Sequence, residues 1–256
     1  MTAVNEAPPI TSTVVDPLDP LALADGARRA LNVRFEAGDG NDVALGHVHR
    51  PTWRGGIHSI GLVVAVPAVV ALLLASSGDG RLRLGVAVYA VGLCSMLAAS
   101  AIYHRWVHGL RARCAWRRVD HAAIFAAIAG SSTPVVLAAL PGATGLMLVG
   151  AIWAAAFVGA GCKLSTWDGG DRAGTGMYAV TIALGVLAFP WLWAREGTGP
   201  AAFVAGGGVV YLAGAFCFAR QWPTVRPTVF SYHEVWHALT VVAAVAQFVA
   251  IWMLAT

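Results

Sequence analysis

Residues 232–254, YHEVWHALTVVAAVAQFVAIWML, decide the fold class of this chain. The segment opens with His233, Glu234 and His237, and about twenty residues without a charged side chain follow Glu234. A helix of about 20 apolar residues, rising 1.5 Å per residue, crosses the hydrocarbon core of a bilayer. The segment therefore predicts a transmembrane helix with two histidines and a glutamate at its start.

The rest of the chain repeats this pattern. Of its 256 residues, 58% are hydrophobic and only 12% are charged, whereas soluble domains carry about 25% charged residues. The apolar residues form blocks that predict seven spans, near residues 57–74, 84–104, 121–140, 145–162, 175–193, 201–219 and 233–254. We therefore expect an all-α protein, a seven-transmembrane helical bundle that occupies residues 47–256.

The first 46 residues have a different character. Positions 1–45 hold seven acidic residues against three arginines, with proline clusters between them, which predicts a disordered acidic N-terminal tail. The remainder holds fourteen basic and six acidic residues. The sequence pI of about 9.1 then reflects arginines in loops beside anionic lipids, so we expect membrane lipids as partners and no nucleic acid.

The arginines also predict an orientation. With the N-terminus in the cytoplasm, eleven cations flank the cytoplasmic ends of the spans and three flank the outer ends. Positive charge is retained on the cytoplasmic side, so we expect a cytoplasmic N-terminus and an external C-terminus. The single lysine among seventeen cations is typical of a GC-rich bacterial genome. The expected location is the bacterial inner (cytoplasmic) membrane, crossed several times.

This topology brings polar residues from distant segments to one depth. The second span ends with Ser100 and His104, the third begins with Asp120, and the seventh begins with His233 and His237. All five then lie near the cytoplasmic face. Polar side chains within spans are costly and usually face a shared interior. We expect one site built from these residues.

The residue types and their spacing indicate a metal site. His233 and His237 are four residues apart, so both imidazoles lie on one helix face. With His104 they provide three neutral nitrogen ligands and leave one position open, as in catalytic Zn²⁺ sites. Asp120 would accept a hydrogen bond from water at the open position or act as general base, and Ser100 would assist.

Simpler interpretations exist for each residue. A single intramembrane histidine is more often a packed, hydrogen-bonded residue, and the coincidence of three favours the metal. Asp120 alone could pair with Arg117 or Arg118, and Ser100 could be a helix-packing serine. The four cysteines lack CxxC spacing and are interpreted as packing residues.

Three other histidines fall outside the predicted site. His121 is rotated by about 100° from Asp120 on a helix, which favours a structural role. His58, at the start of the first span, and His108, in the arginine-rich loop, lack a partner at helical spacing.

Four motifs carry a family resemblance. SAIYH fits an SxxxH motif, RRVDHAAIFAAIAGSSTPVVL resembles a DHxxIFxxIAGxxTP third span, FSYHEVWHALTVVAA resembles an HxxxH seventh span, and RPTWRGGIHSIG precedes the first. Over residues 50–256 the chain is similar to the bacterial hemolysin III branch of the progestin and adipoQ receptor (PAQR) family. The resemblance implies zinc ligands at His104, His233 and His237, with Asp120 and Ser100 beside them. AGSSTP replaces the more common AGTYTP, a mild departure.

The family's relation to alkaline ceramidases implies hydrolysis of a ceramide-like amide or an ester in a lipid, by zinc-activated water at the cytoplasmic side. One alternative is a non-enzymatic receptor or regulator of membrane lipid homeostasis with a structural zinc. A second is an intramembrane HExxH metalloprotease with Glu234 as base and Asp168 in a distant loop, although site-2-type proteases place these motifs in the opposite order. Under the hydrolase hypothesis we expect Glu234 to pair with an arginine such as Arg226.

Two further seven-helix classes are disfavoured. The seventh span contains no lysine, which excludes a retinal protein, and the predicted cytoplasmic N-terminus argues against G-protein-coupled receptors. The substrate and the oligomeric state stay open.

Overall fold

The computed structural model describes residues 51–77, 79–108, 110–166 and 170–256, without the side chain of Leu110. The acidic tail predicted for residues 1–46 lies outside the described residues. All of the described residues belong to one compact unit.

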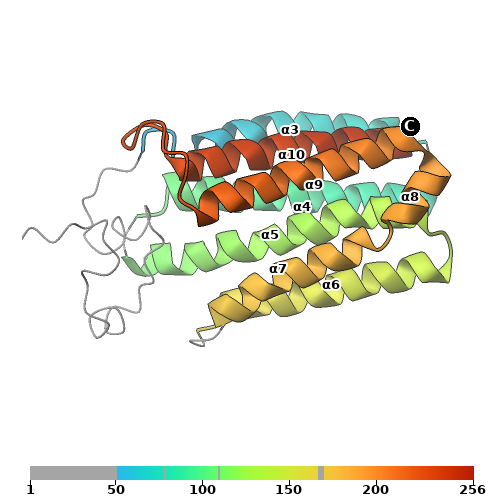
Figure 1. The fold of residues 1–256 in the computed structure, drawn as a ribbon, viewed down its shortest axis with the longest axis horizontal. Helices are drawn as coiled ribbons and strands as arrows, with labels where there is room; N and C mark the ends of the chain where they lie inside the picture. Colours follow the sequence, from blue (N-terminus) through green and yellow to red (C-terminus); the bar gives the residue numbers. More distant parts are fainter. Residues whose placement is uncertain (1–50, 78, 109, 167–169) are drawn as a thin grey trace, which may run out of the picture. The chain divides into compact units, whose positions relative to one another are not determined.

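This unit is built from helices, shown in Figure 1. They are α3 (Gly56–Ala75), α4 (Gly80–Arg105), α5 (Leu110–Ala139), α6 (Ala143–Leu164), α7 (Gly170–Val186), α8 (Phe189–Glu196), α9 (Thr198–Ala219) and α10 (Tyr232–Ala255). Seven stretches are long and apolar enough to cross a membrane, with α7 and α8 together forming the fifth. The prediction of an all-α, seven-span bundle is confirmed.

One expected boundary is wrong, and one expected span contains an interruption that the pattern did not predict. The apolar pattern predicts a third span from residue 121, but α5 begins at Leu110 and carries Arg111 to Arg118 on its first turns. Arginine is a good helix former, so the helix continues beyond the apolar stretch that defines the span. The fifth span is interrupted after Val186, and α8 begins with Pro190 in its first turn, where proline is tolerated because that turn needs no intrahelical donor.

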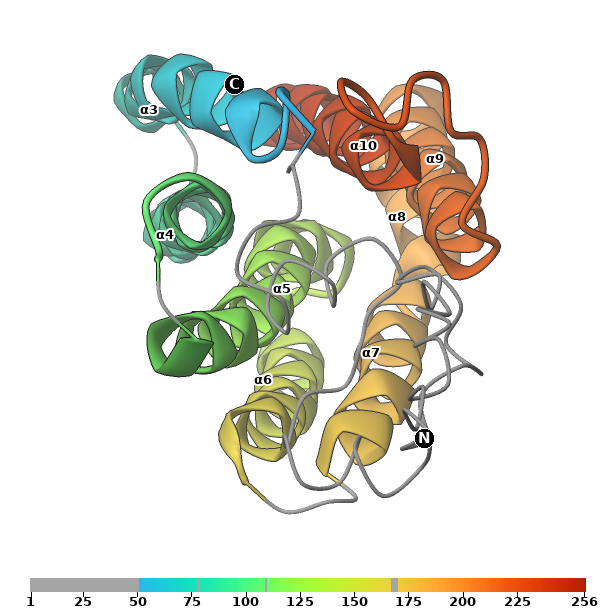
Figure 2. The same ribbon diagram turned by 90° about the vertical axis from the view of Figure 1, so that its left-hand side faces the viewer.

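Helix α5 lies at the centre of the described unit when it is viewed along the helices (Figure 2). It packs against α4, α6, α7, α8 and α10, and α10 in turn packs against α3, α4 and α9. Small residues allow the closest approach: a Cβ on Gly92 of α4 would clash with the carbonyl oxygen of Ala126 on α5. Helices that associate in lipid use such small-residue contacts.

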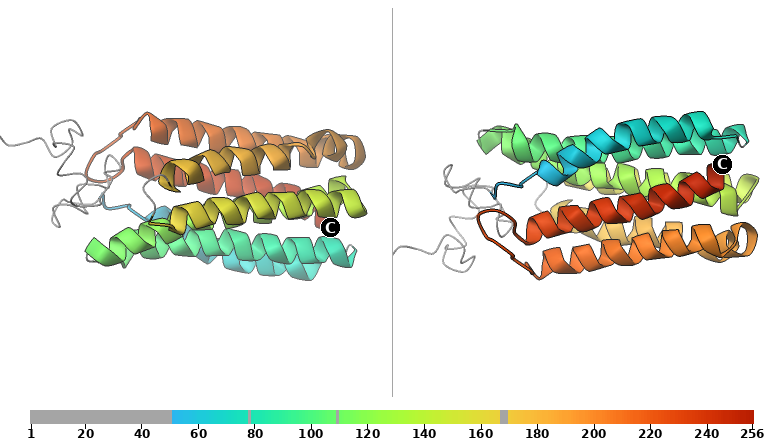
Figure 3. Two further views of the ribbon diagram at one scale, coloured as in Figure 1. Left: turned by 90° about the horizontal axis from the view of Figure 1, so that it is seen from below. Right: turned by 90° about the horizontal axis from the view of Figure 1, so that it is seen from above.

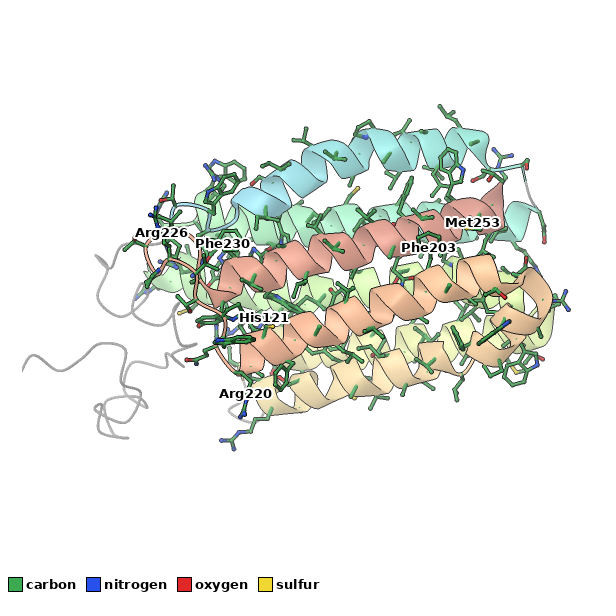
Figure 4. All side chains as sticks on the ribbon, turned by 45° about the horizontal axis from the view of Figure 1, so that its top comes forward. His121, Phe203, Arg220, Arg226, Phe230 and Met253 are labelled. Atoms are coloured by element: carbon green, nitrogen blue, oxygen red, sulfur yellow. The ribbon has the colours of Figure 1, made fainter. Side chains whose placement is uncertain are left out.

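The chain direction alternates from one span to the next (Figure 3). The N-terminal ends of α3, α5, α7 and α10 therefore share one end of the bundle with the C-terminal ends of α4, α6 and α9. The connection from α9 to α10 lies at this end with Arg220, Arg226 and Phe230, and Phe203 and Met253 lie toward the opposite end (Figure 4). The backbone N–H groups of residues 52 and 53 donate to the carbonyls of residues 228 and 229, at 3.1 and 3.2 Å.

Candidate metal centre

Three buried histidines converge at the end of the bundle where α4 ends and α10 begins. His104 lies in the last turn of α4, and His233 and His237 lie in the first two turns of α10. The ring of His104 has its centroid 4.8 Å from that of His233 and 5.0 Å from that of His237. Two helices that are distant in sequence thus present three imidazoles to one point.

The donor set fits a metal ion. One nitrogen from each histidine can be chosen so that all three lie within 4.8 Å of one another. Zinc–imidazole bonds of about 2.0–2.1 Å in a tetrahedral site separate the nitrogens by about 3.4 Å, so binding requires only a small inward rotation of the rings. The buried Nδ1 of His237 makes no hydrogen bond to a described residue, and buried polar atoms of this kind normally have a partner. This group could hold a metal.

Asp120 lies beside this group. Its Oδ2 is 3.7 Å from Nε2 of His104, beyond direct hydrogen-bonding distance and close enough for both to contact one small ligand. Asp120 is buried on α5, and Ser100 is buried on α4 one turn before His104. Asp120 and Ser100 therefore lie near the histidine group on α5 and α4, and their place in the site and their catalytic roles stay predictions.

Both carboxylate oxygens of Glu234 are engaged in structural hydrogen bonds, which is not the arrangement expected of a catalytic base. Its Oε1 accepts a hydrogen bond from Nε of Arg54 at 2.5 Å, and its Oε2 accepts from the backbone N–H and the hydroxyl of Ser231 at 2.7 and 2.6 Å. Ser231 and Glu234 form the capping box of α10, which satisfies donors at the helix start. The expected pairing of Glu234 with an arginine is confirmed, but the suggested partner Arg226 is wrong, because Arg54 occupies that place.

His58 belongs to this region, although the sequence pattern placed it outside the site. This histidine is buried in the first turn of α3, and its ring stacks on that of His237 with centroids 3.9 Å apart and planes inclined by 13°. Its partner lies on another helix, which helical spacing cannot reveal. One sequence signal could have identified His58: it is a histidine at the start of an apolar span, where polar residues are costly. His108 is exposed, in agreement with its exclusion.

Comparison with known proteins gives the family of this fold and site. The family model described as haemolysin-III related matches residues 46–248. The chain belongs to this haemolysin-III-related family. Among curated relatives, it is 29% identical to "Hemolysin-3" of Bacillus cereus over 182 residues, which is 70% of this chain and 80% of the relative. It is 25% identical to "Hemolysin-3 homolog" of Bacillus subtilis (strain 168) over 193 residues, 75% of this chain and 87% of the relative.

In this haemolysin-III-related chain a second polar group fastens α6 to α7 at the same end of the bundle. Nζ of Lys163 donates to Oδ1 of Asp171 and to the hydroxyl of Thr175, each at 2.8 Å. Tyr178 on α7 donates to the carbonyl of His121 on α5 at 2.7 Å. Asp171 and the backbone of His121 thus contribute to helix packing, and Asp168 of the protease alternative lies outside the described residues.

Proposed function

We propose that this protein is a zinc-dependent membrane hydrolase that cleaves an amide or ester bond in a lipid. The observation that carries the proposal is the meeting of three buried imidazoles with the Asp120 carboxylate, 3.7 Å from His104, inside a seven-span bundle. Intramembrane ionisable residues indicate function because their burial is costly. Apolar packing alone could hold α4 and α10 together without the cost of burying ionisable side chains, so these residues indicate a function beyond packing.

The residues of the chain divide the chemistry among them. His104, His233 and His237 would hold the ion through three neutral nitrogens and leave one position open. Zinc in such a site supplies Lewis-acid activation of water and polarisation of a carbonyl. Asp120 would take the proton of the attacking water and pass it to the leaving group. The hydroxyl of Ser100 would donate a hydrogen bond to the substrate carbonyl or to the water.

The carboxylate contacts of Glu234 argue against the protease alternative. An HExxH base must be free to approach water beside the metal, whereas both oxygens of Glu234 already accept hydrogen bonds from Arg54 and Ser231. Asp120 is the carboxylate that lies beside the histidines. The general base of this proposal is therefore Asp120.

We propose in addition that the site lies at the cytoplasmic side of the bacterial inner membrane, with the N-terminus inside. Ten described cations lie at the end of the bundle that holds the histidines, and three (Arg81, Arg83 and Arg195) lie at the other end. The positive-inside rule assigns the first end to the cytoplasm. An alkaline phosphatase fused after Thr256 should be active, and the same fusion in the α4–α5 connection should be inactive; the reverse pattern would overturn this orientation.

The hydrolase proposal is tested by lipid mass spectrometry. Purified protein is incubated with a membrane lipid extract in three states: as isolated, after chelation, and after zinc is restored. We expect released fatty acid in the first and third states, and its loss in Asp120→Ala protein that retains its zinc. The exposed His108→Ala variant is the matched control. Zinc-loaded protein without any product would instead support a non-enzymatic receptor or regulator with a structural zinc.

A further inference from the structure

The start of α3 touches both helices that carry the histidine group. Gly55, the N-cap residue, has a φ of +74°, and a Cβ added there would lie 2.7 Å from Cβ of His104 on α4. Arg54 donates to Glu234 in the first turn of α10. Close to these contacts His58 lies against the face of His237. A short stretch at the start of α3 therefore contacts the elements that must be held together for three imidazoles to meet.

The stacking geometry determines what His58 can do. An ion bound to an imidazole lies in the plane of that ring, because the nitrogen lone pair lies in the plane. The rings of His58 and His237 are 3.9 Å apart and inclined by 13°, so their planes meet only far from both rings. One ion cannot be bound by both histidines in this arrangement. His58 thus covers the face of His237 and leaves uncovered the ring edge that carries the nitrogens.

We propose that His58 is a positioning residue that fixes the ring plane of the ligand His237. This inference rests on the proposed metal site. The χ2 torsion of histidine has a broad energy minimum, so an unsupported ring samples many planes and its lone pair points at the ion only part of the time. A ring packed flat against it limits that rotation and prepares the ligand for binding. Groups that orient metal ligands typically change metal affinity by about 10–100-fold when they are removed.

The proposal requires a flat ring at position 58, and it does not require the nitrogens of His58. Phenylalanine keeps the flat face and leucine keeps a similar volume without it. We therefore expect His58→Phe to retain zinc affinity within about threefold, and His58→Leu to lose at least about tenfold. His108→Ala, which removes an exposed histidine outside the site, should bind zinc as the unaltered protein does.

The experiment measures zinc affinity and ligand geometry together. Each protein is purified in detergent, its folded fraction is checked by gel filtration and circular dichroism, and its zinc affinity is measured by competition with a chromophoric chelator. The visible absorption bands of bound Co²⁺, which depend on ligand geometry, are then recorded. The His58→Leu bands should shift and weaken, and those of His58→Phe should match the unaltered protein, a difference that lower stability alone does not produce.

The outcomes separate this inference from the proposed function. If the unaltered protein binds neither Zn²⁺ nor Co²⁺, the metal site itself is wrong, and the role of His58 is wrong with it. If it binds metal and His58→Leu binds equally well with the same spectrum, the metal site stands and the positioning role is overturned. Equal loss in His58→Phe and His58→Leu would also overturn it, because the nitrogens would then be required.

Discussion

The ion pair between Arg54 and Glu234 gives the sharpest test of how the site is assembled. The side chains are 2% and 0% exposed and join residues on α10 and just before α3. We predict that Glu234→Gln destabilises the protein and leaves its zinc in place. The HExxH interpretation instead predicts a stable protein that has lost its base.

The contacts of Glu234 give the magnitude. Its two oxygens accept three hydrogen bonds, one from Arg54 and two from Ser231. Glutamine offers one acceptor oxygen, so its NH₂ group must face a donor on one side, and the charge of Arg54 loses its partner. Removing one partner of a buried ion pair costs about 3–5 kcal/mol. We expect Glu234→Gln to lower the free energy of unfolding by about 3 kcal/mol or more.

A double-mutant cycle separates the pair from other effects. Arg54→Met alone and Glu234→Met alone should each lower the free energy of unfolding by about as much as Glu234→Gln, because each removes one partner of the buried ion pair. Arg54→Met combined with Glu234→Met removes both charges, and apolar replacement of a buried pair is often close to neutral. The double variant should therefore be more stable than the sum of its single variants by at least about 2 kcal/mol.

Equilibrium unfolding in mixed detergent micelles measures these free energies, and elemental analysis gives the zinc content of the folded fraction. Glu196→Gln, at an exposed glutamate near the opposite end of the bundle, is the matched control. The reasoning is refuted if Glu234→Gln is as stable as Glu196→Gln. It is also refuted if the folded, zinc-loaded Glu234→Gln protein has lost lipid hydrolysis.

Three other perturbations test neighbouring contacts. Gly55→Ala should cost about 1–3 kcal/mol, because a non-glycine residue at a φ of +74° is strained and its Cβ would lie 2.7 Å from Cβ of His104. The control is Gly150→Ala, where an added Cβ meets nothing within 4 Å, and it should not lower the free energy of unfolding in the same assay. Equal effects of Gly55→Ala and Gly150→Ala would contradict the close contact at Gly55. Lys163→Met should lower the free energy of unfolding by about 1 kcal/mol, because Asp171 loses this ion pair but its side chain is 39% exposed and can be hydrated. Adding Asp171→Asn should then change the free energy of unfolding little further. A large extra loss would argue against the pairing. Zinc content should fall as the pH is lowered, because protons compete with the metal for imidazole nitrogens. A pH of about 4 is well below the ordinary histidine pKa. Full retention of zinc after dialysis at that pH would contradict histidine ligation.

The sequence was sufficient to predict the spans and the convergence of the histidines. Long apolar blocks are decided by hydropathy alone, since few structures other than a helix can cross a bilayer. The spacing of His233 and His237 places both on one helix face, and alternation of the spans brings His104 to the same end. These inferences depend on local pattern and chain direction, which the sequence contains.

The remaining features depend on packing between helices. Arg54 and Glu234 are 180 residues apart, so the nearer Arg226 was a reasonable but wrong partner. His58 has no partner at helical spacing, because its contact is the face of a ring on α10. The helical start of α5 was missed because apolar blocks mark where a span lies in lipid, and a helix can extend into water beyond it.

The central claim is that one zinc ion is bound by His104, His233 and His237, and the metal content of purified protein tests it most directly. Elemental analysis should find about one zinc per chain in the unaltered protein and in His108→Ala, as expected for a site with a single set of three ligands. Alanine at all three ligand positions should remove it from protein that remains folded. A folded triple variant with unchanged zinc, or an unaltered protein that takes up no zinc when it is supplied, would contradict the account.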